Sequence, residues 1–354
     1  MASSSPTELS LPQANNPLDE ADQLDVEQTL PTEVDPDPEH DDADSAVGDH
    51  AAPSLASLTE SILQYRTLLG RTYQSSKTND YWAPNDEPQN DGLDMFHNAV
   101  TMLLEDKLFL APIGANPKRV LDIATGTGLW AMDFADAFPE TEVIGTDISP
   151  IQSRWVPPNL EFQIDDMNLP WTWPEDHFDL IHLRVLYGCV PDWEELYKKA
   201  RRYLQPGGWL QDFEMDTLLE SDHDTLSPEE KETLRVWGDL FIEAGKKTGR
   251  SFDIARGHQI KEKMEAAGFV DVVEKKMKIP CGQWPKDSRS KHIGALVQFS
   301  IEESLDGLVA YLGTQVLDWS VEEVTVLTAK LRRIVKRKWS CTYIPAAIVY
   351  GRKP

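Results

Sequence analysis

Cysteine and metal-binding patterns are scarce in this 354-residue chain. The three cysteines, Cys189, Cys281 and Cys341, are far apart, and none belongs to a Cys-x-x-Cys pair. This excludes a disulfide framework and a cysteine-rich zinc site, and it favours isolated thiols in a reducing compartment. The eight histidines show no His-x-x-x-His spacing. The sequence therefore predicts no metal site.

Long apolar runs are also absent. No stretch approaches the roughly 20 apolar residues that a membrane-spanning helix needs. The first residues lack the positively charged segment and the hydrophobic core of a secretory signal. We therefore expect no membrane insertion and a cytoplasmic location, with the nucleus as the alternative.

Positive charge is missing from the start of the chain. Residues 1–65 contain no Lys or Arg, although the whole chain carries 34 basic and 60 acidic residues. The first part is rich in Pro, Asp, Ser and Ala and poor in aromatic residues, which leaves too little apolar surface to offset the entropy of ordering. We predict a disordered acidic tail over residues 1–56, with a protein-binding arm as the alternative. Phosphates would repel such a tail, which argues against a nucleic-acid ligand.

The most informative stretch is a glycine loop that follows a short apolar run. Val120 to Ile123 reads as a buried strand, and Gly126 and Gly128 lead into a helix that begins at about Leu129. Glycine allows the backbone to approach a ligand closely, and the first N–H groups of a helix attract negative charge. A second strand, 143–147, ends in Asp147, whose carboxylate suits the two hydroxyls of a ribose. The pattern indicates a nucleoside site on a parallel sheet.

The acidic residues around this loop bear on which nucleoside binds. Gly126-x-Gly128-x-x-Ala131 also satisfies the loose dinucleotide fingerprint, so a nicotinamide site remains the alternative. However, Asp122 lies at the strand end, where a carboxylate would meet an ammonium group but repel a pyrophosphate. A third strand, 160–164, leads into Asp165, Asp166 and Met167. An acid there can accept from an adenine amino group while Met167 packs on the ring.

These motifs together resemble those of the class I S-adenosylmethionine-dependent methyltransferases. The resemblance includes the acid-x-x-x-Gly-x-Gly loop, the acids after the second and third strands, and a Pro-Gly-Gly turn at residues 206–208. Ala124 departs from the pattern, because the family often has glycine there. The resemblance implies S-adenosylmethionine as cofactor and a doubly wound, Rossmann-like α/β sheet of seven strands, six parallel and one antiparallel. The cofactor-binding residues that we predict are Asp122, Ala124, Gly126, Gly128, Asp147, Ile148, Asp165, Asp166, Met167 and Arg184.

Residues 57–118 form a separate region ahead of the methyltransferase domain, which we place at 119–354. Helices are expected over 57–69, with a capping box at Ser57, and over 91–110. The motifs at 71–73, 84–87 and 93–97 resemble those of the fungal LaeA-like methyltransferases, a group tied to secondary metabolism. In that group the N-terminal helices look like a lid over cofactor and acceptor. The alternative is that Tyr73, Tyr81 and Trp82 simply pack on the sheet.

The acceptor site is predicted beside the fourth strand, 178–184. This strand neighbours the first one at the point where the strand order reverses, and ligands bind beyond the carboxyl ends there. His182, Arg184 and Tyr187 are therefore the candidates for contacts with the acceptor, His182 as a general base. Glu214 and Asp216, after the fifth strand, are expected at the mouth of the site. No residue stands out as an unambiguous base.

The remaining pattern completes an α/β fold. Helices are expected over 193–204, 227–244, 254–267, 301–318 and 321–338, and strands over 209–213, 270–278 and 343–350. Asp192 is expected to cap the first of these helices, and Ser227 and Glu230 have the spacing of a capping box at the start of the second. The last strand is expected to form a hairpin with the strand before it. Pro345 lacks an N–H donor, so it should lie near the start of that strand.

The sequence thus predicts an S-adenosylmethionine-dependent methyltransferase that modifies the oxygen or nitrogen of a small secondary metabolite. Two alternatives remain. The first is a nuclear regulator of secondary metabolism of the LaeA type, which acts through a protein complex; the acidic tail, which has no basic import cluster, counts against it. The second is an NAD(P)-dependent oxidoreductase.

Overall fold

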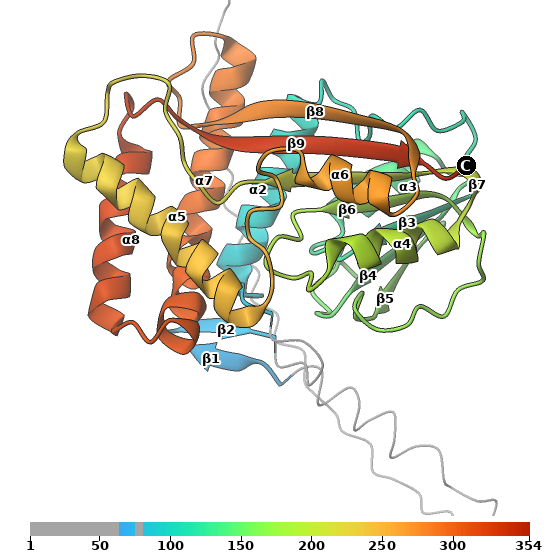
Figure 1. The fold of residues 1–354 in the computed structure, drawn as a ribbon, viewed down its shortest axis with the longest axis horizontal. Coiled ribbons are helices and arrows are strands. Elements are labelled where there is room, and N and C mark those ends of the chain that lie inside the picture. The colour runs from blue at the N-terminus through green and yellow to red at the C-terminus, as the bar shows by residue number, and fades with distance from the viewer. Residues whose placement is uncertain (1–63, 75–80) are drawn as a thin grey trace, which may run out of the picture. The chain divides into compact units, whose positions relative to one another are not determined.

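The computed structural model describes residues 64–74 and 81–354 (Figure 1). The predicted acidic tail, residues 1–56, and the first part of the helix expected over 57–69 lie outside the described residues. Within the described residues, no helix combines the length and the apolar character needed to cross a membrane.

A seven-stranded sheet forms the centre of the fold, in the order β5-β4-β3-β6-β7-β9-β8. β3, β4, β5, β6 and β7 pair in parallel with their neighbours, and β9 runs antiparallel to both β7 and β8. The predicted sheet of six parallel strands and one antiparallel strand is therefore confirmed. The strands are Arg119–Ile123 (β3), Glu142–Asp147 (β4), Leu160–Ile164 (β5), Phe178–Arg184 (β6), Leu204–Met215 (β7), Val270–Cys281 (β8) and Thr342–Arg352 (β9).

Apolar side chains alternate between two cores because the sheet is covered on both faces. Val120 and Leu180 pack with Trp130 and Phe134 of the helix Leu129–Ala137 (α3). Their neighbours Leu121 and Ile181 belong instead to the larger core, which includes residues of Trp193–Tyr203 (α4) and Gln259–Ala266 (α6). Both faces of β3 and β6 are buried, which explains why these strands read as continuous apolar runs.

The chain leaves the sheet between β8 and β9. The helices Ser288–Tyr311 (α7) and Val321–Lys336 (α8), joined by a π-helical segment at Leu312–Val316 (η1), separate the two strands. The predicted hairpin was wrong, although the two strands do pair antiparallel. α7 begins well before the predicted 301–318 helix, and Asp287 caps it by accepting from Ser290 N. Pro345 is the fourth residue of β9, near its start as predicted.

The N-terminal region contains strands as well as a helix. Arg66–Leu68 (β1) and Arg71–Tyr73 (β2) form an antiparallel pair, so the helix predicted over 57–69 was wrong in this part. The following helix, Glu87–Leu103 (α2), begins earlier than the predicted 91–110 because Asp86 caps it and a proline occupies its first turn. It also ends earlier, at Leu103. α2 packs along α7 (Figure 1). Pro228–Thr248 (α5), capped by Ser227 as predicted, lies beside α8.

Candidate functional site

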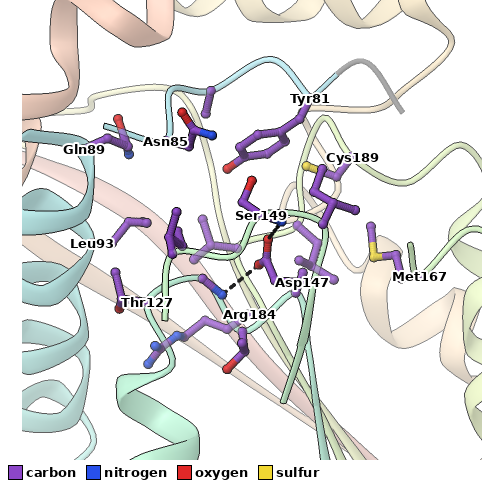
Figure 2. Close-up of a pocket in the computed structure, with 18 of the residues that line it drawn as sticks. Tyr81, Asn85, Gln89, Leu93, Thr127, Asp147, Ser149, Met167, Arg184 and Cys189 are labelled. Atoms are coloured by element: carbon purple, nitrogen blue, oxygen red, sulfur yellow. Dashed lines mark hydrogen bonds between the residues drawn. The ribbon is translucent and has the colours of Figure 1, made fainter. Parts of the chain in front are cut away.

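A pocket lies at the carboxyl ends of β3, β4 and β6, where the strand order reverses (Figure 2). The glycine loop after β3, the segments after β4, β5 and β6, and residues of the N-terminal region line it. Of the residues predicted to contact cofactor or acceptor, the following line the pocket: Asp122, Ala124, Gly126, Asp147, Ile148, Asp165, Asp166, Met167, Arg184 and Tyr187. Gly128 and His182 do not line it.

The glycine loop is built around the carboxylate of Asp147. Gly126 N and Ser149 N each donate to this carboxylate at 2.9 Å (Figure 2). Gly126 has φ +61°, a conformation that glycine adopts without strain. Burial raises the pKa of Asp147 to about 6, although the two backbone donors favour its charged form. The carboxylate is thus fixed at the pocket wall by backbone groups.

Gly128 has a different role from Gly126. It is the N-cap of α3, with φ +86°, and a Cβ there would lie 2.3 Å from the ring of Phe162. Glycine is therefore required at this position so that the loop can pack against β5. This requirement comes from packing within the protein rather than from a ligand.

Asp122 is buried behind the loop and already has two donors. Its Oδ1 lies 2.7 Å from His182 Nδ1, and Thr125 Oγ1 donates to its Oδ2 at 2.5 Å. The His182 ring stacks on Trp130, with ring centroids 3.7 Å apart. Burial lowers the pKa of His182, an effect that Asp122 opposes. His182 thus holds the Asp122 carboxylate in place by a hydrogen bond, and His182 itself does not line the pocket.

Arg184 connects the end of β6 to α2. Its Nη1 lies 3.0 Å from His97 Nδ1, and His97 Nε2 lies 2.8 Å from Asp133 of α3. Burial lowers the pKa of Arg184, while Asp122 and Asp133 raise it. Because an arginine remains charged in proteins, this guanidinium is a fixed positive charge in the pocket wall. The link to His97 fixes it against the N-terminal helix.

Polar and apolar groups meet after β5. The backbone N of Asp165 donates to Asp147 O at 3.0 Å, which joins the two strand ends. Asp166 is buried, and its Oδ2 has no hydrogen-bond partner among the described residues. Met167 is also buried and lies beside it on the wall (Figure 2). An acceptor oxygen beside a thioether matches the edge and the face of an adenine ring.

Three of the side chains that line the pocket carry ionisable O–H or S–H groups. Burial raises the pKa values of Tyr81, Tyr187 and Cys189, that of Cys189 to about 12. All three are therefore protonated at neutral pH, so none is a ready general base. Trp82 packs between Tyr187 and Phe252, with ring centroids 5.8 and 5.0 Å away. This wall is aromatic and largely apolar.

The acids after β7 lie elsewhere than predicted. Glu214 is fully buried and accepts from the backbone N of Leu186 at 2.5 Å and of Tyr187 at 3.1 Å. Asp216 is also buried and forms a bidentate ion pair with Arg256. The prediction that these acids lie at the mouth of the site was wrong. Glu214 instead holds the loop after β6, where Val185 has the strained φ of +58°.

The N-terminal region supplies pocket residues that the sequence did not single out individually. Asn85, Gln89 and Phe96 are buried in the wall, and the half-buried Leu93 of α2 also lines it. The spacing of 89, 93 and 96 places them on one face of a helix, so the periodicity contained a usable signal. Tyr73, by contrast, packs within the fold and donates from its hydroxyl to Gly307 O at 2.8 Å.

No group of three or more His, Cys, Asp or Glu residues is arranged to hold a metal within residues 64–74 and 81–354. The polar groups that line the site include carboxylates, an arginine and side-chain amides.

Comparison with known proteins identifies the family. The sequence model of a family described as "Methyltransferase domain" matches residues 95–274. The methyltransferase pytC of Aspergillus terreus is 36% identical over 313 residues, which cover 86% of this chain and 95% of that protein. The secondary metabolism regulator LAE1 of Cochliobolus heterostrophus is 36% identical, with 75% of this chain and 85% of that protein covered.

A third relative is named for the methylation of a protein. The protein-methionine methyltransferase laeA of Emericella nidulans is 31% identical, with 82% of this chain and 77% of that protein covered. The predicted resemblance to LaeA-like methyltransferases is therefore confirmed, and the oxidoreductase alternative finds no support. The cofactor predicted from the sequence, S-adenosylmethionine, is the methyl donor that this assignment implies. The chain belongs to the methyltransferase domain family, within a group of fungal secondary-metabolism methyltransferases.

Proposed function

We propose that the pocket binds S-adenosylmethionine and that the protein transfers the methyl group to an oxygen or nitrogen of a small secondary metabolite. The observation that carries this proposal is the carboxylate of Asp147, which Gly126 N and Ser149 N fix at the pocket wall. A carboxylate at the end of the second parallel strand suits the two hydroxyls of a ribose.

The rest of the nucleoside follows from this contact. The unpartnered Oδ2 of Asp166 would accept from the adenine amino group, and Met167 would pack against the ring. Ile148 and Asp165 would complete the wall around the base. Gly126 and Ala124 would allow close backbone approach to the thioether end, near Asp122 and Arg184.

The protein has a modest chemical task because the bound cofactor would supply an activated methyl group. Holding two reactants in line can lower a barrier by roughly 7–11 kcal/mol. Tyr81, Trp82 and Tyr187 would orient the acceptor and exclude water from the pocket. Since burial raises the pKa of both tyrosines, we expect them to donate hydrogen bonds rather than remove the acceptor's proton.

We also propose a functional division of the chain. Residues 1–56 would act as an acidic tail, 57–118 as a lid region, and 119–354 as the methyltransferase domain. Support for a lid comes from Tyr81, Asn85 and Gln89, which lie in the pocket wall although they precede the domain.

Calorimetric titration tests the cofactor proposal. S-adenosylhomocysteine and NAD⁺ should be titrated separately into the full chain. We expect binding of S-adenosylhomocysteine and none of NAD⁺. Tight binding of the dinucleotide with no response to S-adenosylhomocysteine would refute the proposal.

The protein has two candidate biological roles, tailoring of a metabolite and regulation. The relative pytC is named a methyltransferase, which is compatible with a tailoring role, and laeA is named a protein-methionine methyltransferase. LAE1 is named a regulator of secondary metabolism, which is compatible with a regulatory role. Untargeted metabolite profiling of a deletion strain separates the two. Loss of one methyl group from one compound family is expected for tailoring. Collapse of many unrelated compound families would instead establish the regulatory role.

A further inference from the structure

Two amide side chains in the lid wall have unused hydrogen-bonding atoms. Asn85 and Gln89 are each 5% exposed, and both line the pocket. Asn85 Nδ2 and Gln89 Oε1 have no hydrogen-bond partner among the described residues. A buried polar atom without a partner costs about 1–3 kcal/mol. One free donor and one free acceptor, side by side in a pocket wall, are therefore explained by a bound molecule that satisfies both.

The backbone holds these two residues firmly in place. Asn85 N donates to Thr72 O at 2.9 Å, and the Thr72 hydroxyl donates to Asn85 Oδ1, also at 2.9 Å. Between them in sequence, Asp86 caps α2 and forms a bidentate ion pair with Arg71, with both contacts at 2.7 Å. The Asn85 amide is thus preorganised, and the backbone of Gln89 is held by its N–H, which donates to the Asp86 carboxylate at 3.3 Å. Such preorganisation reduces the entropy that a ligand must overcome when it binds.

The position of the pair relative to Asp147 indicates which part of the ligand it meets. In Figure 2, Met167 lies on one side of Asp147, and Gln89 and Leu93 of α2 lie on the other. If Asp147 holds the ribose and Met167 packs on the adenine, the amino-acid end of the cofactor extends toward α2. Asp122, the acid predicted to meet the ammonium group, already accepts hydrogen bonds from His182 and Thr125.

We propose that Asn85 and Gln89 bind the amino-acid end of S-adenosylmethionine, with Asn85 Nδ2 donating to the α-carboxylate and Gln89 Oε1 accepting from the α-ammonium. This inference rests on the proposed cofactor site. Arg184 lines the same pocket, and its positive charge favours the α-carboxylate of the cofactor. The assignment makes Asn85 and Gln89 of the N-terminal region part of the cofactor site.

Two thioether nucleosides provide the test. S-adenosylhomocysteine has the amino-acid end, and 5′-methylthioadenosine lacks it but keeps the adenosine. Asn85→Asp preserves size and the contact with Thr72 but replaces the donor with a charged acceptor. Gln89→Met preserves length but removes the acceptor. We expect each variant to bind S-adenosylhomocysteine at least tenfold more weakly in calorimetry, while its affinity for 5′-methylthioadenosine stays within twofold of wild type.

The control is Asn98→Asp, the same chemical change at an exposed position of α2. It should bind both nucleosides as wild type does. An equal loss of both nucleosides in the Asn85 and Gln89 variants would overturn the proposal, because the residues would then support the lid in general. Unchanged affinity for S-adenosylhomocysteine would also overturn it. If wild type binds neither nucleoside, the cofactor proposal fails as well.

Discussion

Individual carboxylates in this protein differ in what they contact, and this decides their roles. Both Asp147 and Asp122 line the pocket, but two backbone N–H groups hold Asp147, whereas the side chains of His182 and Thr125 hold Asp122. The stack of His182 on Trp130 fixes the ring that donates to Asp122. We infer that His182 positions the glycine loop and does not act as a base on the acceptor.

Asp147 should make cofactor binding depend on pH. Burial raises its pKa to about 6, and only the ionised carboxylate can accept from both ribose hydroxyls. We therefore predict that affinity for S-adenosylhomocysteine is full at pH 8 and falls about tenfold for each pH unit below about 6. Calorimetry across this range checks the profile. Asp147→Asn should bind weakly and with little pH dependence in this range, and an unchanged pH profile in that variant would contradict the assignment.

The buried carboxyls of Asp212 and Glu214 should make the stability of the fold depend on pH. Asp212 and Glu214 are both buried in β7, and burial together with the Asp212 carboxyl raises the pKa of Glu214, while burial raises that of Asp212. The folded chain then holds more protons than the unfolded chain. The stabilisation is full below the ordinary carboxyl pKa of about 4 and is lost as pH rises through the raised pKa values, by at most about 1.4 kcal/mol per pH unit for each extra proton.

Asp212→Asn tests this pair. Asparagine can accept from Tyr197, which donates to Asp212 Oδ2 at 2.5 Å, and can donate to Glu214 without titrating. We predict a smaller loss of the free energy of unfolding between about pH 5 and pH 8 than in wild type, measured by urea denaturation. The exposed Asp136 provides a matched control, since Asp136→Asn should leave the wild-type slope unchanged. A slope equal to wild type in Asp212→Asn would show that the pair does not share a proton.

At the scale of elements, the glycine loop combines two distinct requirements. Gly126 needs its left-handed backbone conformation, while Gly128 needs the absence of a Cβ beside Phe162. Gly126→Val should weaken binding of S-adenosylhomocysteine at least tenfold, because a β-branched residue at φ +61° is strained and the loop must shift. Thermal unfolding of the variant should confirm that it still folds. Wild-type affinity in a folded variant would count against the loop as a cofactor site.

The sequence was sufficient for elements whose pattern is local. The apolar runs of β3 and β6 and the caps at Asp192 and Ser227 were predicted because each signal lies within a few residues. The strands β1 and β2 were missed although they are also local, since they join at a two-residue turn of Leu69 and Gly70. The pattern over 57–69 was interpreted as a helix instead. The helix expected over 301–318 left out the first half of α7, which begins at Ser288 after the cap Asp287.

Long-range contacts explain the incomplete prediction of the site. The acids after the strands have a recognisable spacing, whereas Asn85 and Gln89 reach the pocket only because α2 packs along α7 and the Arg71–Asp86 ion pair joins β2 to the helix start. Glu214 was misplaced for a similar reason, since its partners Leu186 and Tyr187 lie on a neighbouring strand's loop. Only the folded chain brings these residues together.

At the scale of the whole molecule, charge is distributed unevenly. The net charge is −26, and the first 65 residues contain acidic residues but no Lys or Arg. We predict that removal of residues 1–56 leaves affinity for S-adenosylhomocysteine within twofold of wild type, because the pocket-lining residues that the structure describes run from Tyr81 onward. Parallel titrations of the full and shortened chains measure this. A large loss of affinity in a folded shortened chain would show that the tail belongs to the cofactor site.

The most direct test of the account is a crystal structure of the protein with S-adenosylhomocysteine. The account predicts both ribose hydroxyls within hydrogen-bonding distance of the Asp147 carboxylate, and the adenine between Asp166 and Met167. Density for the nucleoside in another part of the molecule, or for its sugar away from Asp147, would contradict it.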